Sequence, residues 1–360
     1  MPLLVVPFTH PAFWLLPVLG AVLLTLVLVR AAGALSATGQ RDVVAAEVPE
    51  SERLLPVVVL NPSKFDDPEA AKALITQECR AYGWRPPVYL ETTVEDSGRG
   101  QARQALELAA DVVMTCGGDG TVRLVAQELA GTGVPLGILP AGTGNLLARN
   151  LGVPLNDVSG AVRVALNGNT RPVDLGWVRF DEGDEQPFLV MTGMGFDGEI
   201  MAGAHRELKQ KMGAVAYVAA GARRLNGHRT RTRIAVDDTV GNRQVRSVIV
   251  GNCGKLQAGI ELMPEAQIDD GRLDIMALSP RGVVGWGAVS LALLTKRHHG
   301  HTPVEHAQGQ QIDVWSQKAL SAQVDGDPVG EAIRLQARVD RHALRVRVGD
   351  SVEEDTPSSG

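Results

Sequence analysis

The sequence lacks several patterns that would assign it quickly to a common class of protein. Its 360 residues include only three cysteines, Cys79, Cys116 and Cys253, and their wide spacing forms neither a disulfide framework nor a zinc motif. Free thiols of this kind suit a reducing compartment. The formal net charge of −6 argues against a nucleic-acid-binding protein that works through a broad basic face. The composition is that of a globular protein, and the chain is long enough for about two domains.

The N-terminal segment lacks charge altogether, since residues 1–29 contain no Asp, Glu, Lys or Arg. Residues 11–29 are almost wholly apolar, and as a helix they would span roughly 28 Å, close to the thickness of a bilayer core. A cleaved signal peptide would carry a basic region, and a helix packed on a domain would show a polar face. We therefore expect a single transmembrane helix in residues 1–30. The first basic residues follow it, so the positive-inside rule places the remaining chain in the cytoplasm.

Two similar glycine turns stand out in the chain that follows. Residues 117–121 (Gly-Gly-Asp-Gly-Thr) lie between an apolar run at 112–116 and a helical pattern at 122–129. Residues 140–145 (Pro-Ala-Gly-Thr-Gly-Asn) follow a second strand pattern at 134–139. Neither turn has the Gly-Lys-Ser/Thr of a Walker A loop or the dinucleotide spacing G-x-G-x-x-G. Glycine turns at helix N-termini bind phosphate, and neighbouring strand ends of a parallel sheet share one crevice.

The patterns of apolar residues divide the remaining chain in two. Residues 54–153 alternate strand and helix patterns, which predicts an α/β domain on a parallel sheet. Residues 154–350 show short strand patterns bracketed by turn residues, which predicts a β-rich antiparallel domain. Residues 31–53 are expected to be a linker and residues 351–360 a disordered tail. Strands are expected at 173–178, 188–192, 232–236, 244–252, 272–278, 311–315, 319–324 and 344–348, with helices near 198–225 and 283–297.

The two turns, residues 117–121 and Gly142-Thr143-x-Asn145, resemble the catalytic domain of the diacylglycerol kinase family. That family includes bacterial soluble lipid kinases and sphingosine kinases, and is more distantly related to NAD kinases and phosphofructokinases. The resemblance extends from about residue 57 to residue 348. It implies an ATP-binding α/β domain of the NAD kinase and phosphofructokinase kind, a β-rich second domain, and an active site between them.

The resemblance also implies which residues contact the nucleotide. The family has an Asn-Pro-x-Ser-Gly loop after its first strand, which Asn61 and Pro62 match, with Ser63 supplying the hydroxyl one position early. Thr93, or else Thr92, corresponds to a threonine after the second strand. Taken alone, each threonine would more simply be an ordinary helix cap. The predicted nucleotide contacts are Asn61, Pro62, Ser63, Thr93, Gly117, Gly118, Asp119, Gly120, Thr121, Gly142, Thr143 and Asn145.

Two positions around the turns depart from the family pattern. Leu124 and Leu146 stand where many relatives carry acidic residues. The sequence therefore lacks two carboxylates that the family would place near the nucleotide, while the glycine framework itself is intact.

The expected catalytic residues lie near the C-terminus, in Asp325-Gly326-Asp327. Asp-Gly between two strands is also a common hairpin turn, so the pattern alone favours a turn. The family carries Asp-Gly-Glu here, and its last carboxylate takes the proton of the lipid hydroxyl. By resemblance, Asp327 is the base, and Asp325 supports it or a metal. Geometry decides this role more than intrinsic pKa.

A second acidic turn lies at residues 269–274. A solvated Asp-Gly turn would explain the pattern, but carboxylates and backbone carbonyls are also what hard cations bind. In bacterial relatives this loop holds a structural magnesium, which by resemblance implies the Asp270 side chain and the backbone oxygens of Gln267 and Arg272. The catalytic Mg²⁺ that accompanies ATP is a separate ion.

Together these features predict a membrane-anchored kinase that uses ATP and Mg²⁺ to phosphorylate the hydroxyl of diacylglycerol or a related lipid. Its expected partners are a membrane lipid and the bilayer, and not nucleic acid. Two other interpretations stay open: a kinase for a soluble acceptor such as NAD, and a membrane-tethered nucleotide or lipid sensor without catalysis. The sequence does not identify the lipid. It also leaves the oligomeric state open, and a homodimer is one option.

Overall fold

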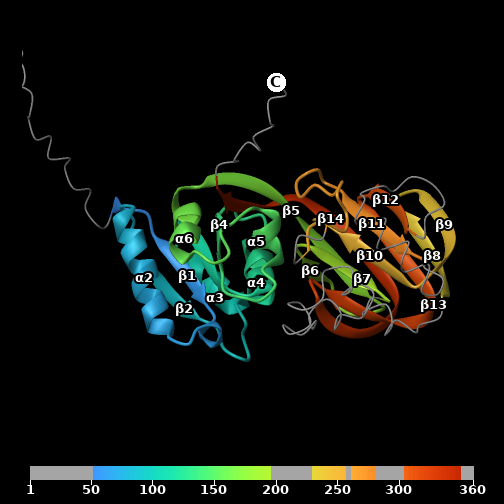
Figure 1. The fold of residues 1–360 in the computed structure, drawn as a ribbon, viewed down its shortest axis with the longest axis horizontal. Helices are drawn as coiled ribbons and strands as arrows, with labels where there is room; N and C mark the ends of the chain where they lie inside the picture. The colour runs from blue at the N-terminus through green and yellow to red at the C-terminus, as the bar shows by residue number, and fades with distance from the viewer. Residues whose placement is uncertain (1–51, 196–228, 257–260, 280–303, 350–360) are drawn as a thin grey trace, which may run out of the picture. The chain divides into compact units, whose positions relative to one another are not determined.

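The structure is a computed structural model, and it describes residues 52–195, 229–256, 261–279 and 304–349 (Figure 1). The chain divides into two units, residues 1–52 and 53–360, and nearly all that is described belongs to the second. Several sequence predictions concern residues outside these ranges: the helices near 198–225 and 283–297, most of the linker at 31–53, and the tail at 351–360.

The predicted fold class is corrected in one respect, the transmembrane helix. Within the described ranges, the structure contains no helix with the length and apolar character that a bilayer crossing requires. The N-terminal transmembrane helix is therefore unsupported, and residues 1–30, which were expected to form it, lie outside those ranges. The cytoplasmic placement inferred from that helix loses its basis as well. The α/β part and the β-rich C-terminal part agree with the structure.

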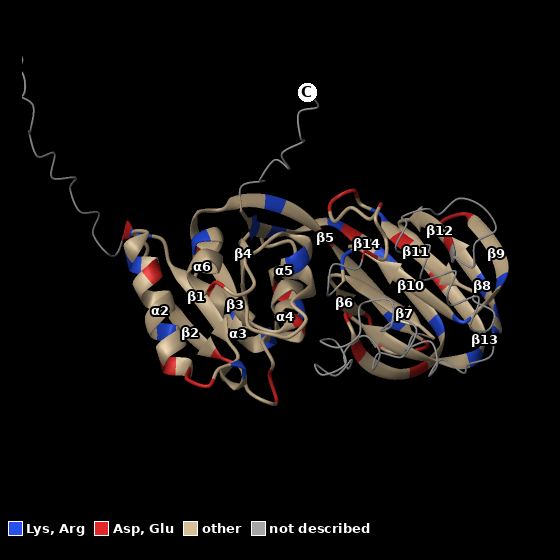
Figure 2. Cartoon of the chain, viewed as in Figure 1, with Lys and Arg blue, Asp and Glu red and all other residues tan. Residues whose placement is uncertain are grey.

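Parallel strands form the centre of the α/β part. They are β1 (Pro56–Leu60), β2 (Val88–Glu91), β3 (Val112–Gly117) and β4 (Leu136–Pro140), in the order β4-β3-β1-β2. Every residue of β1 and β3 is buried, as expected for parallel strands that are covered on both faces. Strands β1, β3 and β4 carry no charged residue, and Figure 2 draws their ribbons in tan.

Helices cover both faces of this sheet. They are α2 (Pro68–Ala81), α3 (Arg99–Glu107), α4 (Asp119–Leu129) and α6 (Val158–Asn167). Helix α2 packs against α6, and α3 packs against α4; right-handed crossovers place these two pairs on opposite faces. Helix α6 lies so close to β4 that a Cβ built at Gly137 would stand 2.6 Å from the Cβ of Ala165.

The β-rich part consists of antiparallel strands. They are β5 (Asn169–Phe180), β6 (Gln186–Phe188), β7 (Met191–Met194), β8 (Thr230–Val236), β9 (Thr239–Val245), β10 (Ser247–Gly251), β11 (Leu273–Leu278), β12 (Val304–Gly309), β13 (Gln311–Val324) and β14 (Asp327–Val348). The strands predicted at 311–315 and 319–324 are one strand, β13, with a register shift between Trp315 and Leu320. Strands β9 and β12 were not predicted.

Strand β14 joins the two parts into one mixed sheet. Its first half pairs with β13, and near its end Val346 pairs in parallel with Leu136 of β4. The described strands therefore follow the order β12-β11-β10-β7-β13-β14-β4-β3-β1-β2, with β5 added on β14 and β8 on β13. The predicted domain limits, 54–153 and 154–350, stay predictions.

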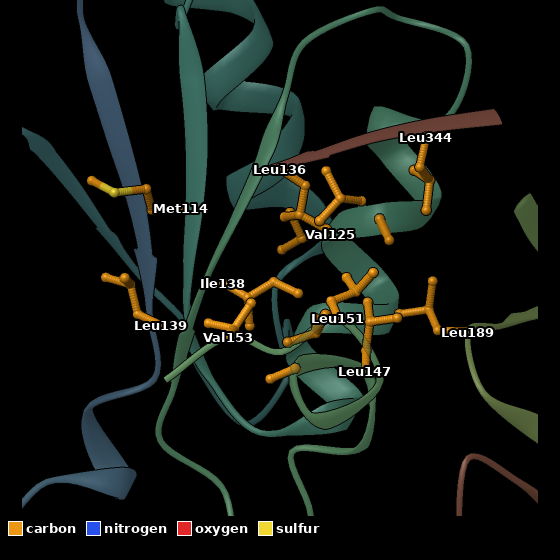
Figure 3. Close-up of a cluster of buried hydrophobic side chains, with 14 of the residues drawn as sticks. Met114, Val125, Leu136, Ile138, Leu139, Leu147, Leu151, Val153, Leu189 and Leu344 are labelled. Carbon is orange, nitrogen blue, oxygen red and sulfur yellow. The ribbon is translucent and has the colours of Figure 1, made fainter. Parts of the chain in front are cut away.

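One buried apolar cluster contains side chains from both parts. It includes Leu147 and Leu151, from α5 (Leu146–Asn150) and the residue after it, together with Leu189 from the segment before β7. Figure 3 shows Leu189 beside Leu147 and Leu151. Burying such side chains stabilises their arrangement by about 1.5–3 kcal/mol each. This packing holds the segment around residue 189 against the second glycine turn.

Candidate active site

The two glycine turns touch each other through their backbones. The amide of Ala141 donates to the carbonyl of Gly117 over 3.0 Å, and a Cβ built at Gly142 would stand 2.7 Å from the Cα of Gly118. No side chain fits at Gly142 without displacing that backbone, which is the reason for glycine there. The turns thus form one surface, as their positions at adjacent strand ends predict.

Gly118 has no such packing reason to be glycine. Its φ of −94° and ψ of −177° suit any residue, and a Cβ there would meet only Gly142 Cα at 3.6 Å and Lys64 Cε at 3.8 Å. By contrast, a Cβ at Gly117 would stand 2.9 Å from the Cβ of Thr121. The missing side chain at Gly118 leaves the backbone amides at the start of α4 open, as anion binding at a helix N-terminus requires.

Asp119 ties the first turn to the second. Its Oδ1 accepts a hydrogen bond of 2.6 Å from the amide of Leu146. Burial raises the pKa of this carboxyl to about 6, with smaller contributions from the charges of Asp325 and Asp327, while the amides of Leu146 and Asn145 act in the opposite direction. Asp119 was predicted as a nucleotide contact; one of its oxygens is already used within the protein.

Asn145 closes the second turn, and Thr143 stays available. The side chain of Asn145 accepts from the amide of Gly142 at 2.9 Å and donates to the carbonyl of the same residue at 2.8 Å. Its φ of 48° is left-handed, which asparagine tolerates better than most residues. Thr143 is exposed, so its hydroxyl can meet a ligand.

The loop after β1 lies beside the glycine turns, whereas the loop after β2 is self-contained. Asn61 accepts from the amide and the hydroxyl of Ser63 at 3.1 and 2.7 Å, at the start of the short helix η3 (Pro62–Lys64). The Lys64 side chain at the end of η3 reaches Gly118. Thr93 is exposed and accepts from the amide of Asp96 at 3.1 Å, within its own turn.

Asp325 anchors the hairpin between β13 and β14. Its side chain is only 2% exposed, and its two oxygens accept from the amides of Leu189, Val190 and Met191 at 3.0, 2.8 and 3.0 Å. A buried carboxylate that accepts several backbone N–H groups is firmly held. Both oxygens are occupied, so Asp325 fixes the hairpin to the segment before β7.

Asp327 lies beside the first glycine turn. A Cβ built at Gly120 would stand 3.7 Å from Asp327 Oδ2, and Arg123 of α4 donates to the same oxygen at 3.0 Å. The side chain of Asp327 is 60% exposed, so it remains accessible to a substrate. The structure therefore brings together the predicted base and the predicted phosphate-binding turn.

Sequence reasoning missed Arg123. Its guanidinium donates to the carbonyl of Val324 at 2.8 Å as well as to Asp327, and it stands 3.9 Å from Asp325 Oδ2. One signal was available in the sequence. Arg123 is the fifth residue of α4, and a cation near the positive end of the helix dipole is unfavourable, so this arginine calls for acidic partners.

The predicted structural metal residues lie in the loop before β11. Asp270 accepts from the amide of Arg272 at 2.9 Å. Within the described ranges, no three His, Cys, Asp or Glu side chains gather to hold a metal, so an ion here would need backbone oxygens such as those of Gln267 and Arg272. Burial, followed by the nearby charges of Asp270 and Glu265, raises the pKa of Asp274 to about 6. This acidic surrounding and the oxygen donors fit a hard cation.

Comparisons with known proteins agree on one family. A model described as "Diacylglycerol kinase catalytic domain" matches residues 57–178, and one described as "YegS C-terminal NAD kinase beta sandwich-like domain" matches residues 190–348. A Pseudomonas aeruginosa protein named "Probable lipid kinase YegS-like" is 33% identical over 258 residues, which cover 69% of this chain and 82% of that protein. The chain belongs to the diacylglycerol kinase catalytic-domain family. The resemblance inferred from the sequence is confirmed.

Other relatives support the same assignment. A protein of Mycobacterium tuberculosis named "Diacylglycerol kinase" is 35% identical over 175 residues, covering 48% of this chain and 56% of that one. The crystal structure of a diacylglycerol kinase from Bacillus anthracis superposes with a TM-score of 0.65 and 25% identity, covering 84% of this chain and 98% of the other. The protein is thus a lipid-kinase family member, and ATP is the co-substrate that a kinase family implies.

We predict that Gly118→Ala folds but binds ATP at least about tenfold more weakly, a loss of ~1.4 kcal/mol. The added methyl finds space in the protein but occupies the approach to the α4 amides. Calorimetric titration with ATP measures the affinity, and a thermal melt checks the fold. Gly142→Ala is the contrasting control, because its methyl meets the Gly118 backbone and should lower the melting temperature. Undiminished ATP affinity in Gly118→Ala would exclude this turn as the phosphate site.

A second prediction concerns pH. The folded pKa of Asp119, about 6, lies above the ordinary aspartate pKa of 3.8, so the folded state holds this proton more tightly than the unfolded state. The contribution of Asp119 to the free energy of unfolding is therefore complete below about pH 4 and is lost as the pH rises through about 6. Asp119→Asn keeps an oxygen for the Leu146 amide and removes this loss. Urea unfolding measures the free energy of unfolding, which should rise in the variant relative to the parent between pH 4 and 7 by on the order of 1–3 kcal/mol. The same dependence of this free energy on pH in both proteins would contradict the assignment.

Proposed function

We propose that this protein is an ATP-dependent kinase that transfers the γ-phosphate of ATP to the hydroxyl of diacylglycerol or a related lipid. The observation that carries the proposal is the contact of Asp327 with Gly120 and Arg123. Phosphoryl transfer needs a phosphate cradle and a carboxylate near the acceptor hydroxyl. Here both meet at the first turn of α4. The lipid class of the acceptor follows the names of the relatives.

The glycine turns would hold the triphosphate. The open amides of residues 118–121 and the exposed hydroxyl of Thr143 are its first donors, and Lys64 beside Gly118 adds a positive charge. Asn61 and Ser63 lie in the same loop as Lys64 and complete the proposed nucleotide contacts on that side. The Mg²⁺ that accompanies ATP neutralises charge on the phosphates. Asp270, with the carbonyls of Gln267 and Arg272, remains the proposed site of a separate structural ion.

The exposed carboxylate of Asp327 would act as the general base. As the lipid oxygen bonds to the γ-phosphorus, Asp327 takes the proton from that hydroxyl, and the bond from phosphorus to the bridging oxygen breaks to release ADP. Asp325 supports this role by fixing the hairpin through its three backbone hydrogen bonds. Aspartate is one methylene shorter than the glutamate that the resemblance implies, and its Oδ2 still lies 3.7 Å from a Cβ built at Gly120.

We predict that Asp327→Asn lowers kcat by about 10²–10⁴-fold, the usual contribution of a general base, and changes KM for ATP by less than about threefold. Radiolabelled ATP is incubated with vesicles that contain diacylglycerol, and label in the organic phase is counted. Asp313→Asn is the matched control, because Asp313 makes an ion pair with Arg334 at the opposite end of β13.

The same assay separates the alternatives. Label in the organic phase that disappears with Asp327→Asn supports the proposal. NAD is offered as an acceptor in parallel, and label on NAD would show that the acceptor is a soluble molecule and not a lipid. ATP binding without transfer to either acceptor would contradict the kinase proposal, and full activity of Asp327→Asn would remove Asp327 from the role of base.

A further inference from the structure

We propose that Arg123 is a positioning residue for phosphoryl transfer, which sets the Asp327 carboxylate against the first glycine turn. The inference rests on the proposed function, because it assigns Arg123 a role through Asp327. Arg123 is the fifth residue of α4 and lies one helical turn beyond the glycine turn that would hold the phosphates. Asp327 comes from a hairpin 204 residues later.

Arg123 supplies the hydrogen bonds that join α4 to this hairpin in the part of the chain that the structure describes. One terminal nitrogen donates to the carbonyl of Val324 at 2.8 Å, and the other donates to Asp327 Oδ2 at 3.0 Å. Its side chain is 14% exposed. A planar guanidinium whose two ends bind different acceptors fixes both distance and orientation, so Arg123 sets where the hairpin stands relative to the glycine turn.

The hairpin itself is rigid, which makes this contact effective. Asp325 is held by backbone amides on one side, and the amide of Gly326 donates to the side chain of Gln323 at 2.7 Å. Asp327 follows this fixed turn and projects toward Gly120. With Oδ2 held by Arg123, the other oxygen of the exposed Asp327 carboxylate can face an acceptor hydroxyl.

Charge gives a second reason for an arginine here. The charges of Asp325 and Asp327 both act on Asp119. A triphosphate bound at the same place would add further negative charge. Arg123, between Asp325 and Asp327, offsets this repulsion, and Lys64 beside Gly118 adds a second positive charge.

The experiment compares Arg123→Ala and Arg123→Lys in the full-length chain, with kcat and KM for ATP measured in the lipid-vesicle assay. We expect Arg123→Ala to lower kcat by about 10–10²-fold and to change KM for ATP by less than about threefold, because the carboxylate loses its position while the phosphate-binding turn is unaltered. Arg123→Lys keeps the charge without the two-ended contact, so it should restore only part of kcat.

The control is Arg103→Ala, which removes the ion pair between Arg103 of α3 and Glu128 of α4. A pair with a well-exposed arginine contributes little, so kcat and KM for ATP of this variant should match the parent. A thermal melt accompanies each variant. If Arg123→Ala does not fold, Arg123→Lys decides: a kcat below the parent with an unchanged KM for ATP supports the inference, and a kcat equal to the parent overturns it.

The outcomes keep this inference apart from the proposed function. If Asp327→Asn is inactive while Arg123→Ala keeps its kcat, the base stands and the positioning role is wrong. If Arg123→Ala raises KM for ATP about tenfold or more with an unchanged kcat, Arg123 binds the phosphates directly and the inference is overturned. If Asp327→Asn remains fully active, the proposed function fails first.

Discussion

A single arginine, the fifth residue of α4, joins two segments that lie 204 residues apart in the sequence. The bond between Arg123 and Asp327 links the β13–β14 hairpin to the first glycine turn, and the proposed site depends on it. Glycine at position 142 lets the two turns touch, and glycine at position 118 leaves backbone amides open. Without the hairpin, the surface of the glycine turns would lack the nearby carboxylate of Asp327. Without the turn, the hairpin would be an ordinary Asp-Gly connection.

The mixed sheet explains how two distant segments reach one place. Strand β14 begins at the hairpin, pairs along β13, and ends beside β4, the strand that leads into the second glycine turn. The apolar packing of Leu189 against Leu147 and Leu151 supports the same arrangement (Figure 3). Asp325 binds the backbone at residue 189, so the core and the hairpin are positioned by one segment. The site is therefore built on strands and helix starts rather than on long loops.

Local patterns predicted the parts of this site that local physics determines. The buried run of β3 and the start of α4 after its glycine turn follow from periodicity and turn chemistry. Strand β9 was missed because its residues are largely exposed and lack alternation. Arg123 was missed because its partners come from a remote strand pairing. The transmembrane helix was expected from hydropathy alone, which reports an apolar run and not a fold.

The most direct measurement is a crystal structure of the full chain with Mg²⁺ and a non-hydrolysable ATP analogue. The account predicts that the γ-phosphate accepts hydrogen bonds from the amides of residues 118–121, about 2.7–3.2 Å away, and that the Asp327 carboxylate faces the same phosphate across the space for one hydroxyl. A triphosphate bound away from these turns, or a hairpin separated from α4 in the complex, would contradict it.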